Sequence, residues 1–256
     1  MPEPKRRAAQ RRAPFRAGRG ARLARVAALA AALCAPAAPL MAQVLEPVVS
    51  GYVTVASDYR HRGLSESSGE PSIQFGADYQ HASGFFAGAW AARIDYAHPA
   101  HESSTRFKVG YYVGVSKRIA RWSWTATAVR YTYPGLAYDY DYNELSATAG
   151  FRDRVFVTAA YIDDFFARDA SAFYSEIGTA LPLPHGLELG ATLGRVTSSA
   201  SQLEYTHWNV GLSKTFARRL GIDVRYHDGS RYVSNAIATT DADAWVVSAS
   251  YGFRSR

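Results

Sequence analysis

Charged side chains recur at every second position of residues 57–65, which read SDYRHRGLS. In an extended strand successive side chains point to opposite faces, so Asp58, Arg60 and Arg62 would share one face, while apolar residues such as Val53 occupy the other. In a soluble sheet protein the ions would lie at the surface and the apolar face would form the core. In a membrane barrel the apolar face would contact lipid and the ions would line the lumen.

A second set of residues with chemical potential is His207, Asn209 and Ser213. A hydrolase needs a serine, a histidine and an orienting polar group within hydrogen-bond reach. Six residues along one strand separate His207 from Ser213 by about 20 Å, so a nucleophile would have to come from another strand. We therefore predict that His207 belongs to a hydrogen-bond network. We predict no catalytic residue, no cofactor and no metal site.

The basic charge is concentrated at the start of the chain. Residues 1–42 contain nine Lys or Arg and one acid, and their net charge of +8 against +7 for the whole chain leaves −1 for the remainder. This argues against nucleic acid as a partner, because residues 43–256 have no net positive charge to neutralise phosphates. A basic run, a short apolar run at 26–33 and small residues up to Ala42 predict a cleaved signal peptide at 1–42. The single cysteine, Cys34, lies within that leader.

After the leader, twelve segments alternate apolar and polar residues with a period of two, which a helix with a period of 3.6 cannot imitate. They lie near residues 49–62, 73–79, 86–96, 107–115, 122–133, 142–150, 155–162, 173–181, 187–194, 205–215, 222–227 and 244–253. The fifth changes parity between Ala126 and Val129, which predicts a β-bulge unless the register assigned to this segment is wrong.

The connections between these segments alternate in length. Long connections follow the odd-numbered segments and short ones follow the even-numbered segments. That regularity is typical of an up-and-down antiparallel transmembrane barrel with long loops outside and short turns in the periplasm. A sandwich with Greek-key crossings gives no reason for it. We therefore predict an all-β outer-membrane barrel of about twelve strands over residues 43–256.

The two parities of these segments predict two environments. Aromatic residues near the segment ends should form the interfacial girdle of the outer face: Tyr59, Tyr79, Tyr96, Trp122, Trp208, Trp245, Tyr251 and Phe253. So many charges of the other parity could not form a dry core, so they should line the lumen: Asp58, Arg60, Arg62, Asp78, Arg93, Asp95, Arg106, Lys108, Glu144, Glu176, Asp223 and Arg225.

Four motifs carry a family resemblance: SDYRHRGLS at 57–65, GFFAGAWAARIDY at 84–96, YTYPG at 131–135 and THWNVGLSKTF at 206–216. In these the chain resembles the TorF family of outer-membrane porins, also called the Gcw_chp family. The resemblance covers nearly all of residues 43–256 and implies a small barrel of the bacterial outer membrane with a porin-like role.

The function expected from these patterns is passive diffusion of small hydrophilic solutes or ions through a barrel narrower than a sixteen-stranded porin. Its expected partners are outer-membrane lipid, small polar solutes and, during biogenesis, the barrel-assembly machinery, and the barrel is expected to be a monomer. The predicted lumen has nearly balanced acids and bases, so the ion preference stays open. Two alternatives remain: a barrel enzyme acting on lipid, and a barrel that mounts binding loops such as the aromatic and acidic run at 138–142.

Overall fold

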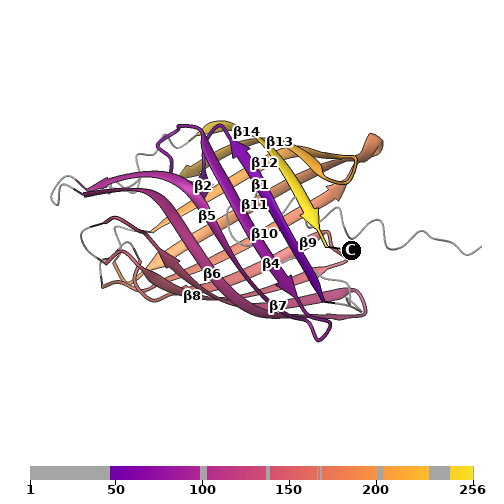
Figure 1. Cartoon of the computed structure of the whole chain (residues 1–256), viewed down its shortest axis with the longest axis horizontal. Coiled ribbons are helices and arrows are strands. Elements are labelled where there is room, and N and C mark those ends of the chain that lie inside the picture. Colours follow the sequence, from indigo (N-terminus) through magenta and orange to yellow (C-terminus); the bar gives the residue numbers. More distant parts are fainter. Residues whose placement is uncertain are drawn as a thin grey trace, which may run out of the picture.

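The barrel architecture is confirmed in a computed structural model, which describes residues 47–98, 103–136, 139–165, 167, 169–200, 204–230 and 243–255. Twelve antiparallel strands form one closed barrel (Figure 1). The predicted signal peptide, residues 1–42, lies outside the described residues. In the part that is described, no helix is long and apolar enough to cross a membrane.

The barrel strands follow the chain order and pair with their sequence neighbours. They are β1 (Val48–Ala56), β4 (Ser72–Gln80), β5 (Phe85–His98), β6 (Ser103–Ile119), β7 (Trp122–Thr132), β8 (Tyr142–Phe151), β9 (Val155–Ile162), β10 (Ala172–Pro182), β11 (Leu187–Ser198), β12 (Tyr205–Phe216), β13 (Leu220–Ser230) and β14 (Ala244–Arg254). Two short strands, β2 (Arg60–His61) and β3 (Leu64–Ser65), pair only with each other.

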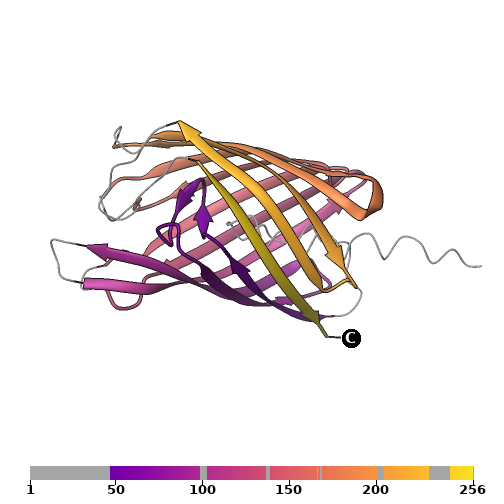
Figure 2. The same ribbon diagram turned by 90° about the horizontal axis from the view of Figure 1, so that it is seen from above.

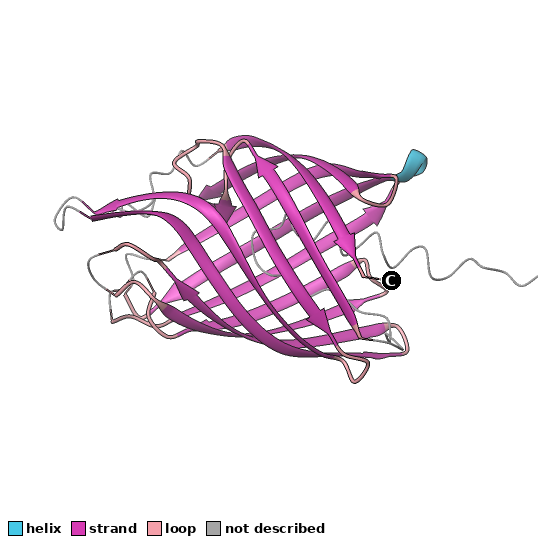
Figure 3. Ribbon diagram, viewed as in Figure 1, coloured by secondary structure: helices cyan, strands magenta, loops and turns pink. Residues whose placement is uncertain are grey.

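Strand β1 closes the barrel because it pairs with both β4 and β14. Val53, for example, lies opposite Tyr251 on one side and Phe75 on the other. Closure leaves no strand edge, so every backbone polar group in the wall can be paired without water. The short turns gather at the end that holds the C-terminus and the 3₁₀ turn Pro184–Gly186 (Figure 3). We call this the turn end and the opposite one the loop end.

The outer face of the barrel is apolar. Exposed large side chains such as Val53, Phe75, Val113 and Leu145 occupy alternate positions of the strands. Among the predicted interfacial aromatics, the following lie on this face with 39 to 68% of their surface exposed: Tyr79, Trp122, Trp208, Trp245, Tyr251 and Phe253. The side chain of Tyr96 lies outside the described part of the chain.

The face predicted for β5 is wrong. Trp90, Ala92 and Ile94 are at most 7% exposed and face the barrel interior, whereas Arg93 and Asp95 have the outward parity. Arg93 is half-buried and donates from Nη1 to the Pro71 carbonyl at 2.8 Å. These two ions are therefore not among the lumen side chains. The segment is apolar on both faces, so the position of its charges was a poor guide to the inside.

The bulge predicted in β7 is also wrong. This strand pairs with β6 and β8 without any shift of register, and both Val129 and Tyr131 face inward. The irregularity lies in β5 instead, between Arg93 and Tyr96. In β5 and β7, large apolar side chains such as Trp90 and Tyr131 face inward because they pack against a segment that enters the barrel.

Candidate functional site

The segment that enters the barrel is residues 57–67, which we call the lumen hairpin. Strand β1 ends at Ala56, and the chain then turns away from the wall and forms the β2–β3 pair inside the barrel (Figure 2). Asp58, Arg60 and Arg62 therefore do not continue β1 along the lumen wall as predicted. Tyr59 is 3% exposed within the interior, so its predicted place in the interfacial girdle is wrong.

The base of the hairpin is organised around one carboxylate. Asp58 accepts hydrogen bonds from Arg60 Nε at 2.7 Å, from Ser65 Oγ at 2.6 Å and from Ser67 Oγ at 2.9 Å. Its salt bridge with Arg60 is almost fully buried. The carboxylate thus joins the two arms of the hairpin, and charge-assisted hydrogen bonds of this kind are roughly twice as strong as neutral ones.

The tip of the hairpin reaches the wall opposite its origin. Arg62 Nη2 donates to Glu144 Oε2 on β8 at 2.7 Å, and the Arg62 guanidinium lies 4.3 Å from the ring centroid of Tyr174 on β10. Strands β8 and β10 flank β9, and β9 lies six strands from β1 in either direction around the barrel. The hairpin therefore crosses the full width of the lumen.

A second ion pair holds the outgoing arm. Lys108 Nζ on β6 donates to Glu66 Oε1 at 2.7 Å, and the lysine side chain has no exposed surface. Its ammonium also lies 4.8 Å from the ring centroid of Tyr131 and 5.6 Å from that of Tyr133, within the range of cation–π attraction. Removing one partner of such a buried pair is costly because the other charge stays desolvated.

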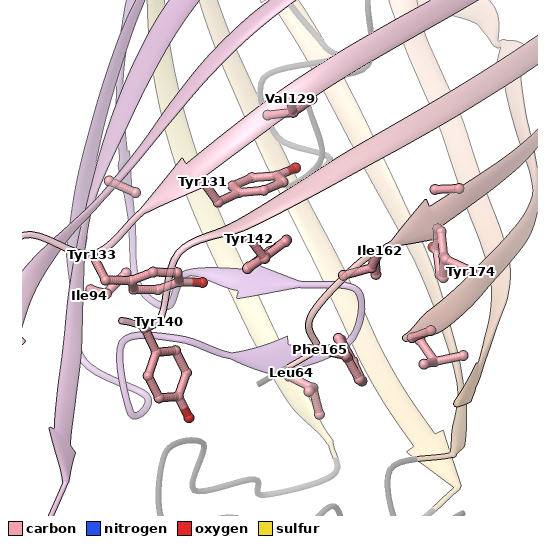
Figure 4. Close-up of a cluster of buried hydrophobic side chains, with 14 of the residues drawn as sticks. Leu64, Ile94, Val129, Tyr131, Tyr133, Tyr140, Tyr142, Ile162, Phe165 and Tyr174 are labelled. Atoms are coloured by element: carbon pink, nitrogen blue, oxygen red, sulfur yellow. The ribbon is translucent and has the colours of Figure 1, made fainter. Parts of the chain in front are cut away.

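Apolar side chains surround these ion pairs and exclude water from them. Tyr59 and Leu64 of the hairpin join a buried cluster with inward side chains such as Trp90, Tyr131 and Phe165 (Figure 4). The cluster also contains Tyr140 and Tyr142, which are 4% and 7% exposed. These two tyrosines of the 138–142 run are therefore unavailable as a binding surface, and Tyr138 lies outside the described residues.

The glycine at the tip is required by its surroundings. Gly63 has φ of +84°, and a Cβ built there would lie 2.7 Å from Cγ of His207 on β12. We expect Gly63→Ala to weaken docking of the hairpin by at least 1 kcal/mol, because the left-handed backbone and the close approach both disfavour a side chain. The midpoint of denaturant unfolding measures this, with Gly69→Ala, at a positive φ but in open space, as the control for backbone strain.

His207 itself is part of a hydrogen-bond chain. Its Nε2 lies 3.1 Å from Tyr174 Oη, which donates to Glu176 Oε2 at 2.6 Å. Asn209 instead donates to Thr192 Oγ1 at 2.6 Å, and Ser213 Oγ lies 3.5 Å from the Glu188 carbonyl. The set His207, Asn209 and Ser213 is thus engaged with separate partners and does not form a catalytic group.

The other charged side chains that were predicted to line the lumen lie on the barrel wall. Arg225 donates from Nε and Nη2 to both oxygens of Asp223, and from Nη1 to Asn209 Oδ1 at 2.6 Å. Asp78 accepts a hydrogen bond from Tyr112 Oη. Arg106 is exposed on β6, apart from these groups.

Part of the lumen wall toward the turn end carries small polar side chains. These inward positions are half-exposed: Ser116, Ser146, Thr148, Thr158 and Ser250. On the β5–β6 side of the same end, the buried rings of Phe86 and Tyr112 face inward instead. An eight-stranded barrel is just wide enough for its own side chains to fill, and a twelve-stranded wall is wider. We call this region the inner vestibule. Across the described residues, no group of three or more His, Cys, Asp or Glu is arranged to hold a metal ion.

Sequence reasoning missed Glu66 and Tyr174 as parts of the site. Glu66 follows the recognised motif directly, and Tyr174 was counted only as part of a strand. The available signal was the Arg62-Gly63 pair, which marks a turn and so a possible end of the strand before it. No feature of the sequence indicates that the turn would fold inward and meet β6, β8 and β10.

The chain matches one family model and is similar to several solved structures. The model of the family described as "Bacterial protein of unknown function (Gcw_chp)" matches residues 45–253. The curated proteins include no match. Among solved structures, the KdgM porin is 12% identical over 80% of this chain and 99% of its own, with a TM-score of 0.49. The outer membrane protein Omp33 of Acinetobacter baumannii is 11% identical over 81% and 98%, with a TM-score of 0.42.

A further chain, from "Unveiling the Mechanism Behind the in-meso Crystallization of Membrane Proteins", is 10% identical over 81% of this chain and 83% of its own, with a TM-score of 0.50. At such low identity this likeness shows the fold alone. The family match is of another kind, because it runs from before β1 into β14 and includes all the motifs that carried the resemblance. The chain therefore belongs to the Gcw_chp family of bacterial proteins.

Proposed function

We propose that the protein is an outer-membrane channel for small hydrophilic solutes, in which the lumen hairpin forms the constriction. The closed barrel with an apolar outside and a polar inside supports the membrane location, because only closed barrels and helices satisfy their backbone in lipid.

The observation that carries the proposal is the contrast between the two halves of the lumen. The outer half is closed by a hairpin that spans it through Arg62 and Glu144. Much of the inner half is lined by small polar side chains such as Thr148 and Thr158. A barrel that served only as a mount for surface loops would need no such polar lining. A passage with one narrow section explains both the closed outer half and the polar lining of the inner half.

The charges of the vestibule favour cationic solutes. Arg60, Arg62, Lys108 and Arg225 each form a salt bridge with an inward acid. Three inward carboxylates take part in no salt bridge between described residues: Asp78, Glu176 and Glu188. Of these, Glu188 is the half-exposed acid at the start of β11, near the turn end. Among the described inward side chains of the wall, the charge without a salt-bridge partner is therefore negative, and acidic linings select cations.

Glu188→Gln is expected to lower the ratio of cation to anion permeability about two-fold, because it removes one fixed charge from a narrow lumen. The reversal potential under a salt gradient in planar bilayers measures this ratio. The matched control is Glu70→Gln, an exposed carboxylate at the loop end, which should leave the ratio unchanged. Anion preference in the unaltered protein would contradict the cation assignment. Absence of conductance both in the folded protein and after removal of the hairpin would contradict the channel.

A further inference from the structure

The two ends of the barrel carry opposite charge. Among the described residues, exposed or half-exposed cations gather in the short turns and the strand ends beside them: Lys117, Arg118, Arg121, Arg152, Arg154, Lys214, Arg218, Arg219 and Arg254. The described acids of the same regions are Asp153, which is bound to Arg118 at 2.7 Å, and Glu188, which faces the lumen. The cations thus lie at three of the five short turns, 120–121, 152–154 and 217–219, and at the end of β14, with little internal compensation. We call this set the basic ring.

The loop end has the reverse character. Its exposed described acids are Glu70, Asp95, Asp139, Asp163, Asp169, Glu204 and Asp243. Fewer described cations are exposed in that region, and Arg195 is paired with Glu204 at 3.5 Å. A general need for solubility would not sort the two signs to opposite ends. The sorting points to different surroundings at each end.

Several turn-end cations lie against aromatic side chains of the outer face. Lys214 Nζ lies 5.2 Å from the ring centroid of Phe216, and Arg219 Nη1 donates to Tyr251 Oη at 3.2 Å. Phe216 and Tyr251 are 44% and 48% exposed on the outer face. Their cations are thus placed outside the lumen, where the apolar band ends.

Strands β6 to β8, on another part of the barrel wall, repeat the arrangement. The Arg152 guanidinium lies 5.2 Å from the ring centroid of Phe151, which contacts outward-facing Trp122 at 4.9 Å between centroids. Lys117 has the same parity as the outward Val115 on β6. Long basic side chains at this depth extend along apolar surface and place their charge among lipid headgroups.

We propose that this basic ring binds the headgroups of anionic phospholipids, such as phosphatidylglycerol, around the turn end of the barrel. Arg and Lys are suited to phosphate oxygens through charge-assisted hydrogen bonds, and a basic segment at a membrane surface attracts anionic lipid. The aromatic side chains hold the apolar part of the same lipid at the interface. This surface lies outside the lumen and does not depend on whether the barrel conducts.

Fluorescence quenching by brominated lipid tests the proposal on the full folded protein. Trp122 and Trp124 lie beside the basic ring, so a Trp208→Phe, Trp245→Phe background removes the two outward tryptophans of the loop end. The protein is reconstituted in phosphatidylcholine vesicles that contain brominated phosphatidylglycerol or, separately, brominated phosphatidylcholine. We expect phosphatidylglycerol to be favoured about three-fold at low salt, and the preference to decrease at high ionic strength.

Substitutions of its basic side chains test whether the basic ring causes the preference for phosphatidylglycerol. Lys117→Gln combined with Arg121→Gln and Arg152→Gln, all beside the two reporter tryptophans, should bring the ratio close to one, whereas Arg121→Lys with Arg152→Lys should retain most of it. The matched control is Arg106→Gln with Arg195→Gln at the loop end, which should leave the ratio unchanged. Equal quenching by both lipids in the unaltered protein would overturn the proposal. An equal loss in the loop-end control, or binding of a soluble polyphosphate without any lipid preference, would do so as well.

Discussion

Excision of residues 59–66, with two glycines joining Asp58 to Ser67, is expected to raise the single-channel conductance about two- to five-fold, because the segment spans an otherwise wide twelve-stranded lumen. The connection can be closed, since Asp58 Oδ1 and Ser67 Oγ are only 2.9 Å apart. All twelve wall strands stay intact. Water would then reach Lys108 and Glu144, so neither charge would be left buried without a partner.

Planar bilayer recordings of the excised and unaltered proteins make the comparison. A control in the same connection is Ser68→Gly, at an exposed position with φ of +57°, which should leave the conductance unchanged. Retention of heat-modifiable migration on a gel would show that the excised barrel is folded. Equal conductance of the excised and unaltered proteins would show that the hairpin does not limit passage.

Lys108→Met is expected to lower the free energy of unfolding by about 3 kcal/mol, because it leaves the Glu66 carboxylate buried without its partner. The side chain of Glu66 is 7% exposed and that of Lys108 is completely buried. The decrease in the free energy of unfolding cannot exceed the free energy needed to detach the hairpin from the wall. A detached hairpin would return Glu66 to water and so remove the buried charge. We therefore also expect more frequent open events in bilayer recordings.

The double variant Lys108→Met with Glu66→Gln distinguishes a buried charge from a packing defect. Without a charge on either side the loss should shrink to about 1 kcal/mol, since a neutral amide is much less costly to bury than a carboxylate. Lys117→Met, at an exposed lysine of the same strand, is the matched control and should change stability little. A double variant as unstable as Lys108→Met alone would contradict the role of the ion pair.

The wall of the barrel could be predicted because its signals are local. Alternation with a period of two placed β9 and β12 within a residue of their observed ends, and loop lengths gave the up-and-down order. The face of a strand was predicted well where only one parity was apolar, as in β1 and β14. It was predicted wrongly in β5, where both faces are apolar, because periodicity cannot tell lipid from a cluster such as Trp90 and Ile94.

The sequence by itself determined the number of strands, their order and most of the lipid-facing side chains, because these depend on backbone period and connection length. Only the tertiary structure decided what residues 57–67 do. The charges of Asp58, Arg60 and Arg62 continue the alternation of β1, so nothing local separates them from the wall. The position of Arg62 is set by Glu144 and Tyr174, which lie far along the chain and come within reach only when the barrel closes. Long-range ion pairs of this kind determine where the hairpin docks, and no local pattern in the sequence encodes them.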